Sequence, residues 1–284
     1  MNNLETIRTK FDELSVCVVI PTYNNSATLA EVISDVSLYT SNIIVVNDGS
    51  TDDSEAIAQS FSQVQLISYP NNVGKGWALR QAFAYAIAQQ YKFAITIDSD
   101  GQHFAKDLPA FINKLTDIKD AIIIGSRNMD QASVPGKSSF GNKFSNFWFK
   151  IETGISSPDT QSGFRAYPLE LLKGMRFFTK KYEFEIEVLV RAVWKGAKIE
   201  SIPVTVYYAP KEVRVSHFRP FKDFTRISIL NTVLVFITFL YIKPRNFLRI
   251  LFDKKKVYTS LKNNYSIQMS QISLKHFQLP LAFL

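Results

Sequence analysis

Two aspartates, Asp98 and Asp100, follow directly on the apolar run of residues 93–97. Such a run is typical of a buried strand, whose side chains alternate, so both carboxylates lie on one face if the strand continues to Asp100. Two neighbouring carboxylates repel each other and lose hydration unless a cation neutralises them. Mg²⁺ or Mn²⁺, bound by carboxylates and substrate phosphates, would do so. The alternative is that one aspartate caps the turn DSDG while the other is solvated.

Three further polar residues, Tyr23, Asn24 and Asp48, stand where two other apolar runs end. If these runs are strands of one parallel sheet, their carboxyl ends meet at the edge where ligands bind in open α/β sheets. Asp48 also begins an Asp-Gly pair, which by itself indicates a turn. The pattern therefore predicts either a ligand site that gathers these side chains or a set of turn residues.

A lysine, Lys75, lies between two glycines in the segment NNVGKG. The glycines allow a tight turn, and they also allow the backbone to approach an anion closely. Lys75 is thus either a solvated loop residue or a phosphate ligand. Gln102, two residues beyond Asp100, is chemically suited to be a neutral oxygen ligand, although most glutamines are surface residues. We interpret the neighbouring His103 as structural or as a support for the metal ligands.

A second set of candidate residues contains Arg127, Asp159 and Arg165. The planar fork of an arginine matches the oxygens of a phosphate, so both arginines are candidate phosphate ligands. The alternative for Arg165 is a salt bridge to an acidic neighbour. Asp159 would orient either the acceptor of a reaction or an arginine.

Apolar runs alternate with helical patterns along the first 100 residues, and this alternation predicts an α/β fold with a mostly parallel sheet covered by helices on both faces. We expect strands within residues 15–25, 42–54, 64–70, 92–100 and 121–129. Helices are expected within residues 26–40, 55–63 and 71–90, and a helix followed by a strand within residues 182–204.

The composition excludes several classes of protein. With 284 residues, 46% hydrophobic and 20% charged, the chain is globular and long enough for one large domain or two small ones. The single cysteine, Cys17, lies in an apolar run, which indicates a core residue and a reducing compartment. The polar N-terminus has no apolar core of signal-peptide type. No Gly-x-Gly-x-x-Gly turn follows the first strand, which disfavours a nucleotide-cofactor dehydrogenase.

The positive charge is concentrated in the last quarter of the chain. Residues 210–284 hold 13 Lys and Arg against 3 Asp and Glu, a net charge of +10, whereas residues 1–209 hold 20 against 22. We therefore expect a domain at residues 1–209 and a basic, aromatic-rich segment at 210–284 that meets an anionic surface. An apolar stretch at residues 227–242 favours a membrane over nucleic acid as that surface.

The apolar stretch of residues 227–242 has 16 residues, which is short for a membrane span of roughly 20. Basic residues flank both of its ends, so a helix that lies in the membrane interface, or a re-entrant one, is favoured. A core or dimer helix and a short spanning helix remain alternatives. Residues 257–284 carry no motif that we can interpret.

Six segments resemble, in order, the motifs of family 2 glycosyltransferases. They are VVIPTYNN, VVNDGSTDDS, NNVGKG, TIDSDGQH, IIIGSR and DTQSGFRAY, within roughly residues 15–220. The sequence is most similar to the dolichyl- or polyprenyl-phosphate sugar transferases. The resemblance implies a GT-A nucleotide-diphospho-sugar transferase fold, a UDP- or GDP-sugar donor, a Mg²⁺ or Mn²⁺ ion, and inversion at the anomeric carbon.

The resemblance also assigns roles to individual residues. The nucleotide site would contain Pro21, Tyr23, Asn24, Asp48, Lys75 and Asp98. The metal and the diphosphate would be held by Asp98, Asp100 and Gln102. The catalytic set would be Asp100, Arg127, Asp159 and Arg165. Two positions depart from the family pattern, because relatives often carry Glu at the position of Asn24 and more often Asp at that of Asn47.

The nature of the acceptor decides whether a general base is needed. A lipid phosphate is already ionised at neutral pH, whereas a hydroxyl needs a base within hydrogen-bond reach. Glu183, Glu185 and Glu187 are candidate bases, but three glutamates on one helix are most often a solvated face.

We therefore expect a membrane-associated transferase on the cytoplasmic face that delivers the sugar to a lipid-linked acceptor, a polyprenyl phosphate. The first alternative is a hydroxyl acceptor on a glycolipid or polysaccharide. The second alternative is a non-catalytic nucleotide-binding scaffold protein. Nucleic acid is not expected as a partner, and a homo-oligomer is left open.

Overall fold

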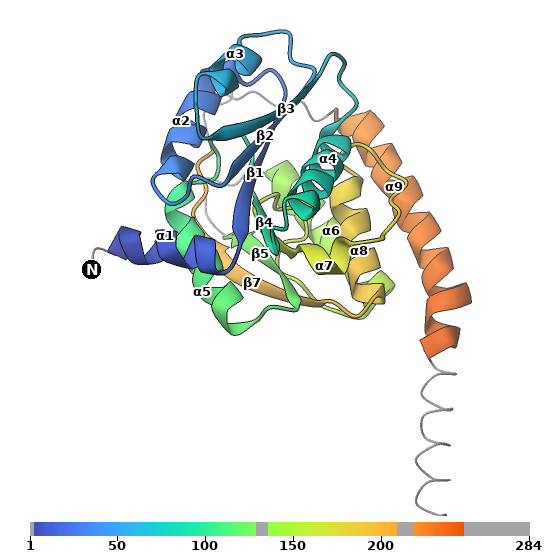
Figure 1. The fold of residues 1–284 in the computed structure, drawn as a ribbon. Coiled ribbons are helices and arrows are strands. Elements are labelled where there is room, and N and C mark those ends of the chain that lie inside the picture. The colour runs from blue at the N-terminus through green and yellow to red at the C-terminus, as the bar shows by residue number, and fades with distance from the viewer. Residues whose placement is uncertain (1–2, 129–135, 209–218, 247–284) are drawn as a thin grey trace, which may run out of the picture. The chain divides into compact units, whose positions relative to one another are not determined.

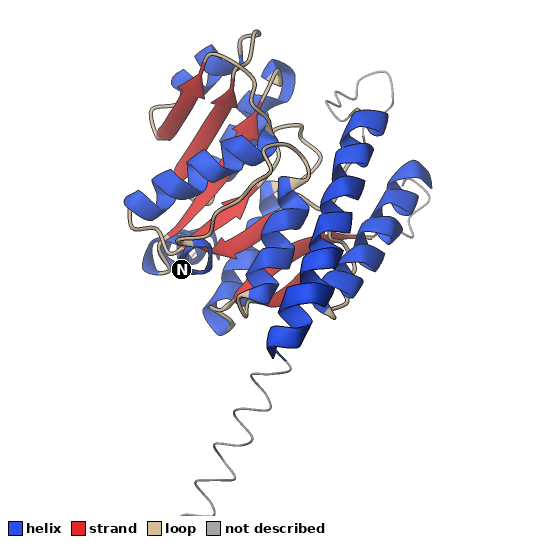
Figure 2. Ribbon diagram, turned by 90° about the vertical axis from the view of Figure 1, so that its right-hand side faces the viewer, coloured by secondary structure: helices blue, strands red, loops and turns tan. Residues whose placement is uncertain are grey.

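The computed structural model describes residues 3–128, 136–208 and 219–246. Its contacts divide the chain into two units, Met1–Leu234 and Val235–Leu284, each of which is described by itself. The first unit contains a seven-stranded sheet (Figures 1 and 2). The strands are β1 (Val16–Thr22), β2 (Ile43–Asp48), β3 (Val64–Tyr69), β4 (Phe93–Thr96), β5 (Ala121–Arg127), β6 (Arg165–Pro168) and β7 (Lys198–Val204).

The sheet has the strand order β3-β2-β1-β4-β6-β5-β7. Strand β6 pairs antiparallel with β4 and β5, and the other pairings in the described chain are parallel. The expected mostly parallel α/β sheet is therefore confirmed. Because β1, β2 and β4 run in parallel, their carboxyl ends meet at one edge, where Thr22 pairs with Asn47.

Helices cover both faces of the sheet (Figure 1). The helices of the first unit up to residue 194 are α1 (Asn3–Glu13), α2 (Ser26–Ser37), α3 (Ser54–Gln59), α4 (Lys75–Ala88), the 3-10 turn η1 (Ala105–Asp107), α5 (Leu108–Asp117), α6 (Gly136–Thr153), α7 (Leu169–Leu172) and α8 (Phe184–Trp194). The expected helices and the helix–strand pair at residues 182–204 are thus present.

Alternate residues of the buried strands belong to two hydrophobic cores, one on each face of the sheet. Val18 and Ile20 of β1 pack with α1, α2 and α5, whereas Cys17 and Val19 pack with α4 and α8 on the other face. A strand that is apolar on both faces has no solvated side, which explains its unbroken apolar sequence. Cys17 is confirmed as a core residue, and burial raises the pKa of its thiol to about 12.

The first unit continues into the C-terminal helix α9 (Pro220–Ile237). Ile227 and Leu234 are buried in the same core as α4, α8 and Phe149 of α6. The expected domain boundary at residue 209 falls in the segment 209–218, which lies outside the described residues. The first half of α9 is therefore part of the domain core.

The C-terminal helix is longer than the apolar stretch predicted. Helix α9 continues through a π-helical stretch, η2 (Thr238–Ile242), so that an apolar helix runs over 26 residues from Phe221 to Asn246. Within the described part of the chain, it is the one helix whose length and composition suffice to cross a membrane. The helix is therefore longer than the 16 residues of the apolar stretch considered in the sequence. Whether the helix spans or lies flat stays a prediction, and residues 247–284 lie outside the described part.

Candidate active site

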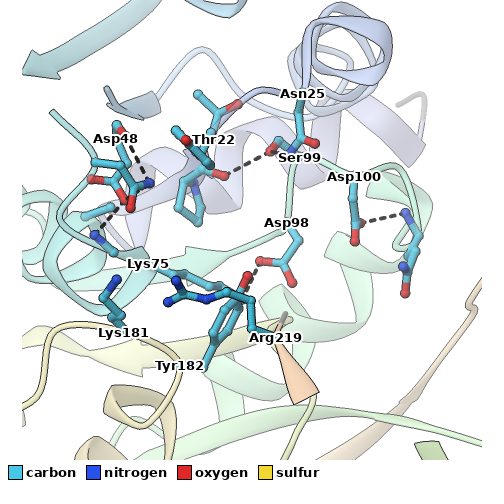
Figure 3. A pocket seen from close by; sticks show the side chains of 16 residues that line it. Thr22, Asn25, Asp48, Lys75, Asp98, Ser99, Asp100, Lys181, Tyr182 and Arg219 are labelled. Atoms are coloured by element: carbon cyan, nitrogen blue, oxygen red, sulfur yellow. Dashed lines mark hydrogen bonds and ion pairs between the residues drawn. The ribbon is translucent and has the colours of Figure 1, made fainter. Parts of the chain in front are cut away.

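A cavity of about 600 Å³ lies at the carboxyl ends of β1, β2 and β4 (Figure 3). Seven of the eleven candidate residues line it: Pro21, Tyr23, Asp48, Lys75, Asp98, Asp100 and Gln102. Four do not: Asn24, Arg127, Asp159 and Arg165. The parallel topology explains the first group, because neighbouring strands deliver their terminal residues to one edge.

One end of the cavity is organised by Asp48, the last residue of β2. Its carboxylate accepts hydrogen bonds from the backbone N–H groups of Val73 and Gly74, each at 2.8 Å, and from Asn72 Nδ2 at 3.0 Å. Burial raises the pKa of Asp48, and these donors oppose the rise. Asp48 therefore fixes the loop before α4, and Gly74 in that loop has φ +126°, a conformation that favours glycine.

Lys75, the first residue of α4, is paired with two carboxylates. Its Nζ lies 2.7 Å from Asp98 Oδ1 and 3.1 Å from Glu185 Oε1. Burial opposes the charge of Lys75, but the two carboxylates outweigh it and raise the lysine pKa. Burial likewise opposes the charge of Asp98, and Lys75 lowers the pKa of this carboxyl. A Cβ on Gly163 would lie 2.6 Å from Asp98 Oδ2 and 2.8 Å from Lys75 Nζ, so a larger residue there would force the ion pair to shift.

The segment DSDG is a turn, because β4 ends at Thr96. Asp100 Oδ1 accepts the backbone N–H of Gln102 at 3.0 Å, which is the capping role considered as the alternative to metal binding. Asp98 and Asp100 nevertheless line the same cavity. Ser99 between them donates its hydroxyl to Pro21 O at 3.0 Å, which ties the turn to the end of β1.

His103 lies behind this turn, buried with its ring 5.3 Å from the ring of Phe164. Burial lowers the pKa of His103 to about 4, although Asp98 opposes the shift, so the imidazole is neutral at pH 7. The backbone of His103 forms a bridge with Val206, after β7. These contacts agree with a structural role for His103.

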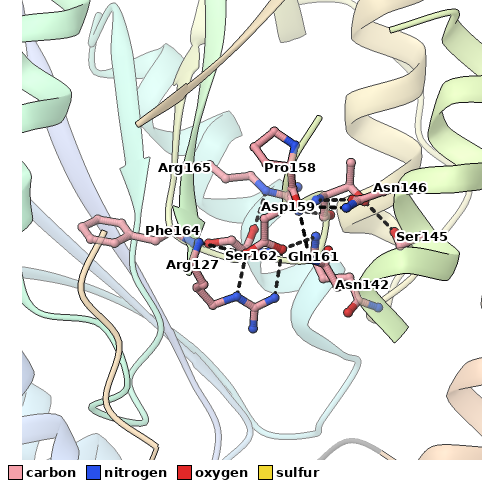
Figure 4. A network of polar contacts seen from close by, with 11 residues as sticks. Arg127, Asn142, Ser145, Asn146, Pro158, Asp159, Gln161, Ser162, Phe164 and Arg165 are labelled. Atoms are coloured by element: carbon pink, nitrogen blue, oxygen red, sulfur yellow. Dashed lines mark hydrogen bonds and ion pairs between the residues drawn. The ribbon is translucent and has the colours of Figure 1, made fainter. Parts of the chain in front are cut away.

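Arg127 and Asp159 form a bidentate pair outside the cavity lining (Figure 4). Arg127 Nε lies 2.7 Å from Asp159 Oδ2, and its Nη2 lies 2.9 Å from Oδ1. The backbone N–H groups of Arg127, Gln161 and Ser162 also donate to this carboxylate. Burial alone would raise the pKa of Asp159, but Arg127 and these donors lower it. Asp159 therefore orients an arginine, one of the two roles expected.

Arg165 is fully buried and does not reach the cavity. Its guanidinium donates to the carbonyl oxygens of Thr160, Ser162 and Glu185 at 2.8, 2.6 and 2.7 Å. These partners are backbone carbonyls rather than the acidic side chain expected. With its donors on carbonyl oxygens, Arg165 holds the chain before β6, and direct phosphate contact is not available to it in this arrangement.

Asn24 forms part of a turn beside the cavity. Its φ is +49°, its backbone N–H donates to Ser50 Oγ, and its Oδ1 accepts the N–H of Thr51 at 2.8 Å. The next residue, Asn25, lines the cavity instead. Asn24 therefore lies outside the cavity lining, and its contact with a nucleotide stays a prediction.

The three glutamates of residues 183–187 are not a solvated face. Each is at most 9% exposed, because the start of α8 packs under the cavity. Glu187 accepts the N–H groups of Phe178 and Thr179 and pairs with Arg191 at 3.0 Å. Only Glu185 of the three is paired with a cavity residue, Lys75. The expectation of a solvated face was wrong.

The cavity contains residues that the sequence reading missed. They are Thr22, Asn25, Ser99, Lys181, Tyr182 and Arg219, among others. The first three are neighbours of residues that were chosen, so the strand-end signal could have found them. Lys181, Tyr182 and Arg219 come from segments far away in the sequence, and no local pattern marks them.

The oxygen ligands at the turn suit a hard divalent cation, since Asp98, Asp100 and Gln102 line one cavity. Among the described residues, no group of three or more His, Cys, Asp or Glu side chains is placed to hold a metal ion. The remaining ligands would therefore come from substrate oxygens or water.

A family model described as glycosyl transferase family 2 matches residues 17–175. The chain belongs to this family, and it is a glycosyltransferase. The expected family and enzyme class are thereby confirmed.

Individual relatives extend the similarity to about two thirds of the chain. Glycosyltransferase AglJ of Haloferax volcanii is 30% identical over 199 residues, which cover 69% of this chain and 64% of the relative, just under two thirds of its length. Polyprenol monophosphomannose synthase of Mycolicibacterium smegmatis is 28% identical over 215 residues, which cover 70% of this chain and 79% of the relative.

A solved structure supports the fold assignment. Glucosyl-3-phosphoglycerate synthase from Mycobacterium tuberculosis, in complex with Mn²⁺, UDP and phosphoglyceric acid, superposes with a TM-score of 0.62 at 21% identity. The match covers 82% of this chain and 81% of that one. The expected GT-A-like fold is confirmed.

Proposed function

We propose that this protein is a metal-dependent, inverting transferase that moves a sugar from a nucleotide sugar to a polyprenyl phosphate at the cytoplasmic membrane surface. The observation that carries the proposal is the charge pattern of the cavity. Its described lining contains three carboxylates and three cationic side chains: Asp48, Asp98, Asp100, Lys75, Lys181 and Arg219. Such a lining suits a ligand that brings a divalent cation and a diphosphate together.

A divalent cation fits the residues of the turn after β4. Asp100 and Gln102 offer oxygen ligands, and Asp98 can join them if its ion pair with Lys75 is shared or released. The cation, when bound, supplies positive charge that stabilises the departing diphosphate. The complex of Mn²⁺ and UDP in the glucosyl-3-phosphoglycerate synthase, a protein of the same fold, supports this assignment.

We assign the nucleoside to the part of the cavity lined by Pro21, Tyr23 and Asp48. The diphosphate would then lie toward Lys75 and Arg219, whose positive charges match it. Lys75 is held at the cavity by two carboxylates, Asp98 and Glu185, so its ammonium group is kept close to the place assigned to the diphosphate.

The acceptor reacts at the anomeric carbon of the bound donor. A phosphate oxygen of the acceptor forms the new C–O bond on the face opposite the diphosphate, and the bond from that carbon to the diphosphate breaks. Both electrons of the broken bond leave with the nucleoside diphosphate, and the configuration inverts. A lipid phosphate is already ionised, so the chain need only align the two reactants.

We assign recognition of the acceptor phosphate to Arg127. Its guanidinium is held in one orientation by Asp159, and its side chain is 14% exposed. Arg165 takes no part in contact and instead holds residues 160–165 in place. The printed name of the mycobacterial relative, a polyprenol monophosphomannose synthase, supports a polyprenyl phosphate acceptor.

The second candidate function is transfer to a hydroxyl, favoured by one observation. Glu185 lies beside the cavity residue Lys75 and offers a carboxylate for proton removal. Its ion pair with Lys75 counts against this role, because a base must be free to take the proton. A non-catalytic scaffold remains the alternative of another class.

The test is release of nucleoside diphosphate by the purified protein with Mg²⁺ or Mn²⁺ and a panel of UDP- and GDP-sugars. Each donor is measured alone, with a short-chain, water-soluble polyprenyl phosphate, and with glycolipid or polysaccharide acceptors that offer a hydroxyl, so that no membrane is needed. Release that depends on the lipid phosphate supports the proposal. Release that depends only on hydroxyl acceptors overturns the acceptor assignment, and absence of both release and nucleotide binding favours the scaffold.

A further inference from the structure

Helix α6 carries an exposed aromatic stripe that the cavity does not use. Phe140 and Phe147 are 66% and 57% exposed, and Phe144 lies between them in the helical repeat. The opposite side of the helix is buried, with Phe149 in the domain core. The stripe is thus the outer face of a helix that is firmly attached to the domain.

The start of α9 extends this aromatic surface. The rings of Phe144 and Phe224 are 5.1 Å apart, which brings the two helices together. On α9, Phe221 is 91% exposed and Phe224 is 42% exposed. We call these exposed aromatics of α6 and residues 220–224 the α6–α9 face.

The charges around the α6–α9 face have one sign. Lys143 and Lys150 of α6 and Lys222 of α9 are exposed. The acidic residues of the same helix segments, Glu152 and Asp223, are buried at 1% and 0% exposure. Lysines beside exposed aromatic rings match the headgroup region of an anionic bilayer, where rings insert and ammonium groups meet lipid phosphates.

We propose that the α6–α9 face docks on an anionic lipid bilayer, with α6 as a second membrane-contacting helix besides the C-terminal one. Two observations favour lipid over a protein partner: the face is bordered by positive charge, and α9 continues into the helix that is long and apolar enough to cross a membrane. The inference rests on the proposed lipid-linked acceptor, because it gives the catalytic domain its own contact with the surface that holds that acceptor.

The single cysteine of the chain, Cys17, is buried. A thiol-reactive label therefore reaches a cysteine that is introduced on the surface. Phe147→Cys is labelled with an environment-sensitive fluorophore in the full-length chain. The matched control is Phe178→Cys, because Phe178 is 79% exposed but lies outside α6 and α9. Both proteins are mixed with vesicles of phosphatidylcholine alone or with added phosphatidylglycerol.

The label at position 147 should shift to the blue on the anionic vesicles, several-fold more than on neutral ones, while the label at 178 stays unchanged. Phe140→Glu with Phe147→Glu should lower partition into anionic vesicles about tenfold at unchanged thermal stability. A label at 147 that stays aqueous on vesicle-bound protein overturns the proposal. So does a shift that follows protein concentration without vesicles, because a second copy then covers the face. Nucleotide release with the soluble acceptor tests the proposed function separately.

A second inference rests on the ion pairs of Lys75. The lysine shares its charge between Asp98 at 2.7 Å and Glu185 at 3.1 Å, and Gly163 packs so close to the Lys75–Asp98 pair that an added Cβ would collide with both partners. A divalent cation on Asp98 would compete with the ammonium group for the same carboxylate. Glu185 is then the partner to which Lys75 can withdraw.

We propose that Lys75 is an exchangeable counter-ion of the metal site and that Glu185 is a positioning residue for the exchange. The inference rests on the proposed metal and is read from Mn²⁺ binding, which needs no turnover. Lys75→Met should tighten Mn²⁺ binding about tenfold, the fold-change of one charge-assisted hydrogen bond. Lys181→Met is the matched control, because Lys181 lines the same cavity but has no ion pair with Asp98.

Glu185→Gln should weaken Mn²⁺ binding in the natural chain and have a smaller effect in the Lys75→Met background. Equal tightening by Lys75→Met and Lys181→Met would overturn the exchange, because the two lysines would then act through their charge alone. Equal effects of Glu185→Gln in both backgrounds would overturn the role of Glu185. No Mn²⁺ binding in any variant would instead remove the metal from the proposed function.

Discussion

Asp159→Asn should destabilise the first unit strongly, although the side chain keeps its shape. The carboxylate of Asp159 is fully buried and accepts two hydrogen bonds from the Arg127 guanidinium. Three backbone N–H groups also donate to it. An amide has one accepting oxygen, so its NH₂ group would face donors, and Arg127 would lose its counter-charge.

The magnitude follows from burial. Breaking a buried ion pair by removing one partner costs about 3–5 kcal/mol. The Arg127 side chain is 14% exposed and can recover some hydration, so we expect the lower end, about 3 kcal/mol. A change of 1 kcal/mol shifts Tm by roughly 2–4 °C in a domain of about 150–250 residues, so the unfolding transition should fall by about 6–12 °C.

The effect should depend on pH in a defined direction. Arg127 and the backbone donors outweigh burial and hold the pKa of Asp159 below its ordinary value. The folded state therefore binds fewer protons than the unfolded state, so the stabilisation is full above the unfolded pKa of about 4. It is lost as the pH falls through the folded-state pKa. The Tm difference between the natural chain and Asp159→Asn should be constant from about pH 8 to 5 and shrink below about pH 4.

Thermal unfolding in detergent measures both quantities. Asp120→Asn is the control, because the pair of Asp120 with Lys198 is exposed and screened by water, so its removal should change the melting temperature little. Adding Arg127→Met to Asp159→Asn should recover a large part of the loss, because no unpaired charge then remains. Unchanged melting of Asp159→Asn at pH 7, or a difference that grows on acidification, would refute the assignment of Asp159 as the orienting partner of Arg127.

Three further outcomes are expected. Asp100→Asn should abolish metal-dependent transfer with little change in Tm, because Asp100 is a cavity residue. Transfer measured across Mn²⁺ concentrations tests this. Unchanged activity would remove Asp100 from the metal site. The pKa of His103 is lowered to about 4 by burial, so the free energy of unfolding should fall by up to about 3 kcal/mol as the pH drops from about 6.5 to 4. Urea unfolding of a His103→Phe variant should lack this component. Removal of residues 235–284 should leave the first unit folded, whereas removal of residues 210–284 should unfold it. The reason is that Ile227 and Leu234 are buried in the core of that unit. Equal thermal stability of the two truncated proteins would contradict this packing.

The sheet was predictable because each buried strand is a continuous apolar run that ends in polar residues. β1 reads as one such run from Val16 to Ile20, and the packing of both of its faces explains why no polar residue interrupts it. Strand β6 was missed, because it has four residues and begins with Arg165, a charged residue that is buried with hydrogen bonds to Tyr167 and to the distant Glu185 carbonyl.

The site was predictable where it depends on strand ends and not where it depends on tertiary pairing. Asp48, Asp98 and Asp100 follow strands and line the cavity as expected. Glu185 was assigned to a solvated face because its partner Lys75 stands 110 positions earlier, and only the fold brings α4 against α8. The sequence identified Arg219 only as one of the basic residues of the C-terminal segment. It lines the cavity because the residues that begin α9 belong to the first unit.

Arg127 and Arg165 show why a residue type alone does not define a role. Arg127 is the last residue of β5 and Arg165 is the first residue of β6, and the guanidinium of each donates more than one hydrogen bond. Arg165 places its donors on carbonyl oxygens, whose partial charges leave the guanidinium charge inside the protein without a facing carboxylate. Arg127 faces a full negative charge, because its guanidinium pairs with the Asp159 carboxylate. Arg127, Asp159 and Arg165 together therefore carry one positive charge in excess. Burial opposes the charge of both arginines, but their partners raise both pKa values, and Asp98 near Arg127 and Glu185 near Arg165 contribute to this. Negative charge of the cavity and of its partner Glu185 thus acts on residues outside the lining, since neither Arg127, Asp159 nor Arg165 lines the cavity itself.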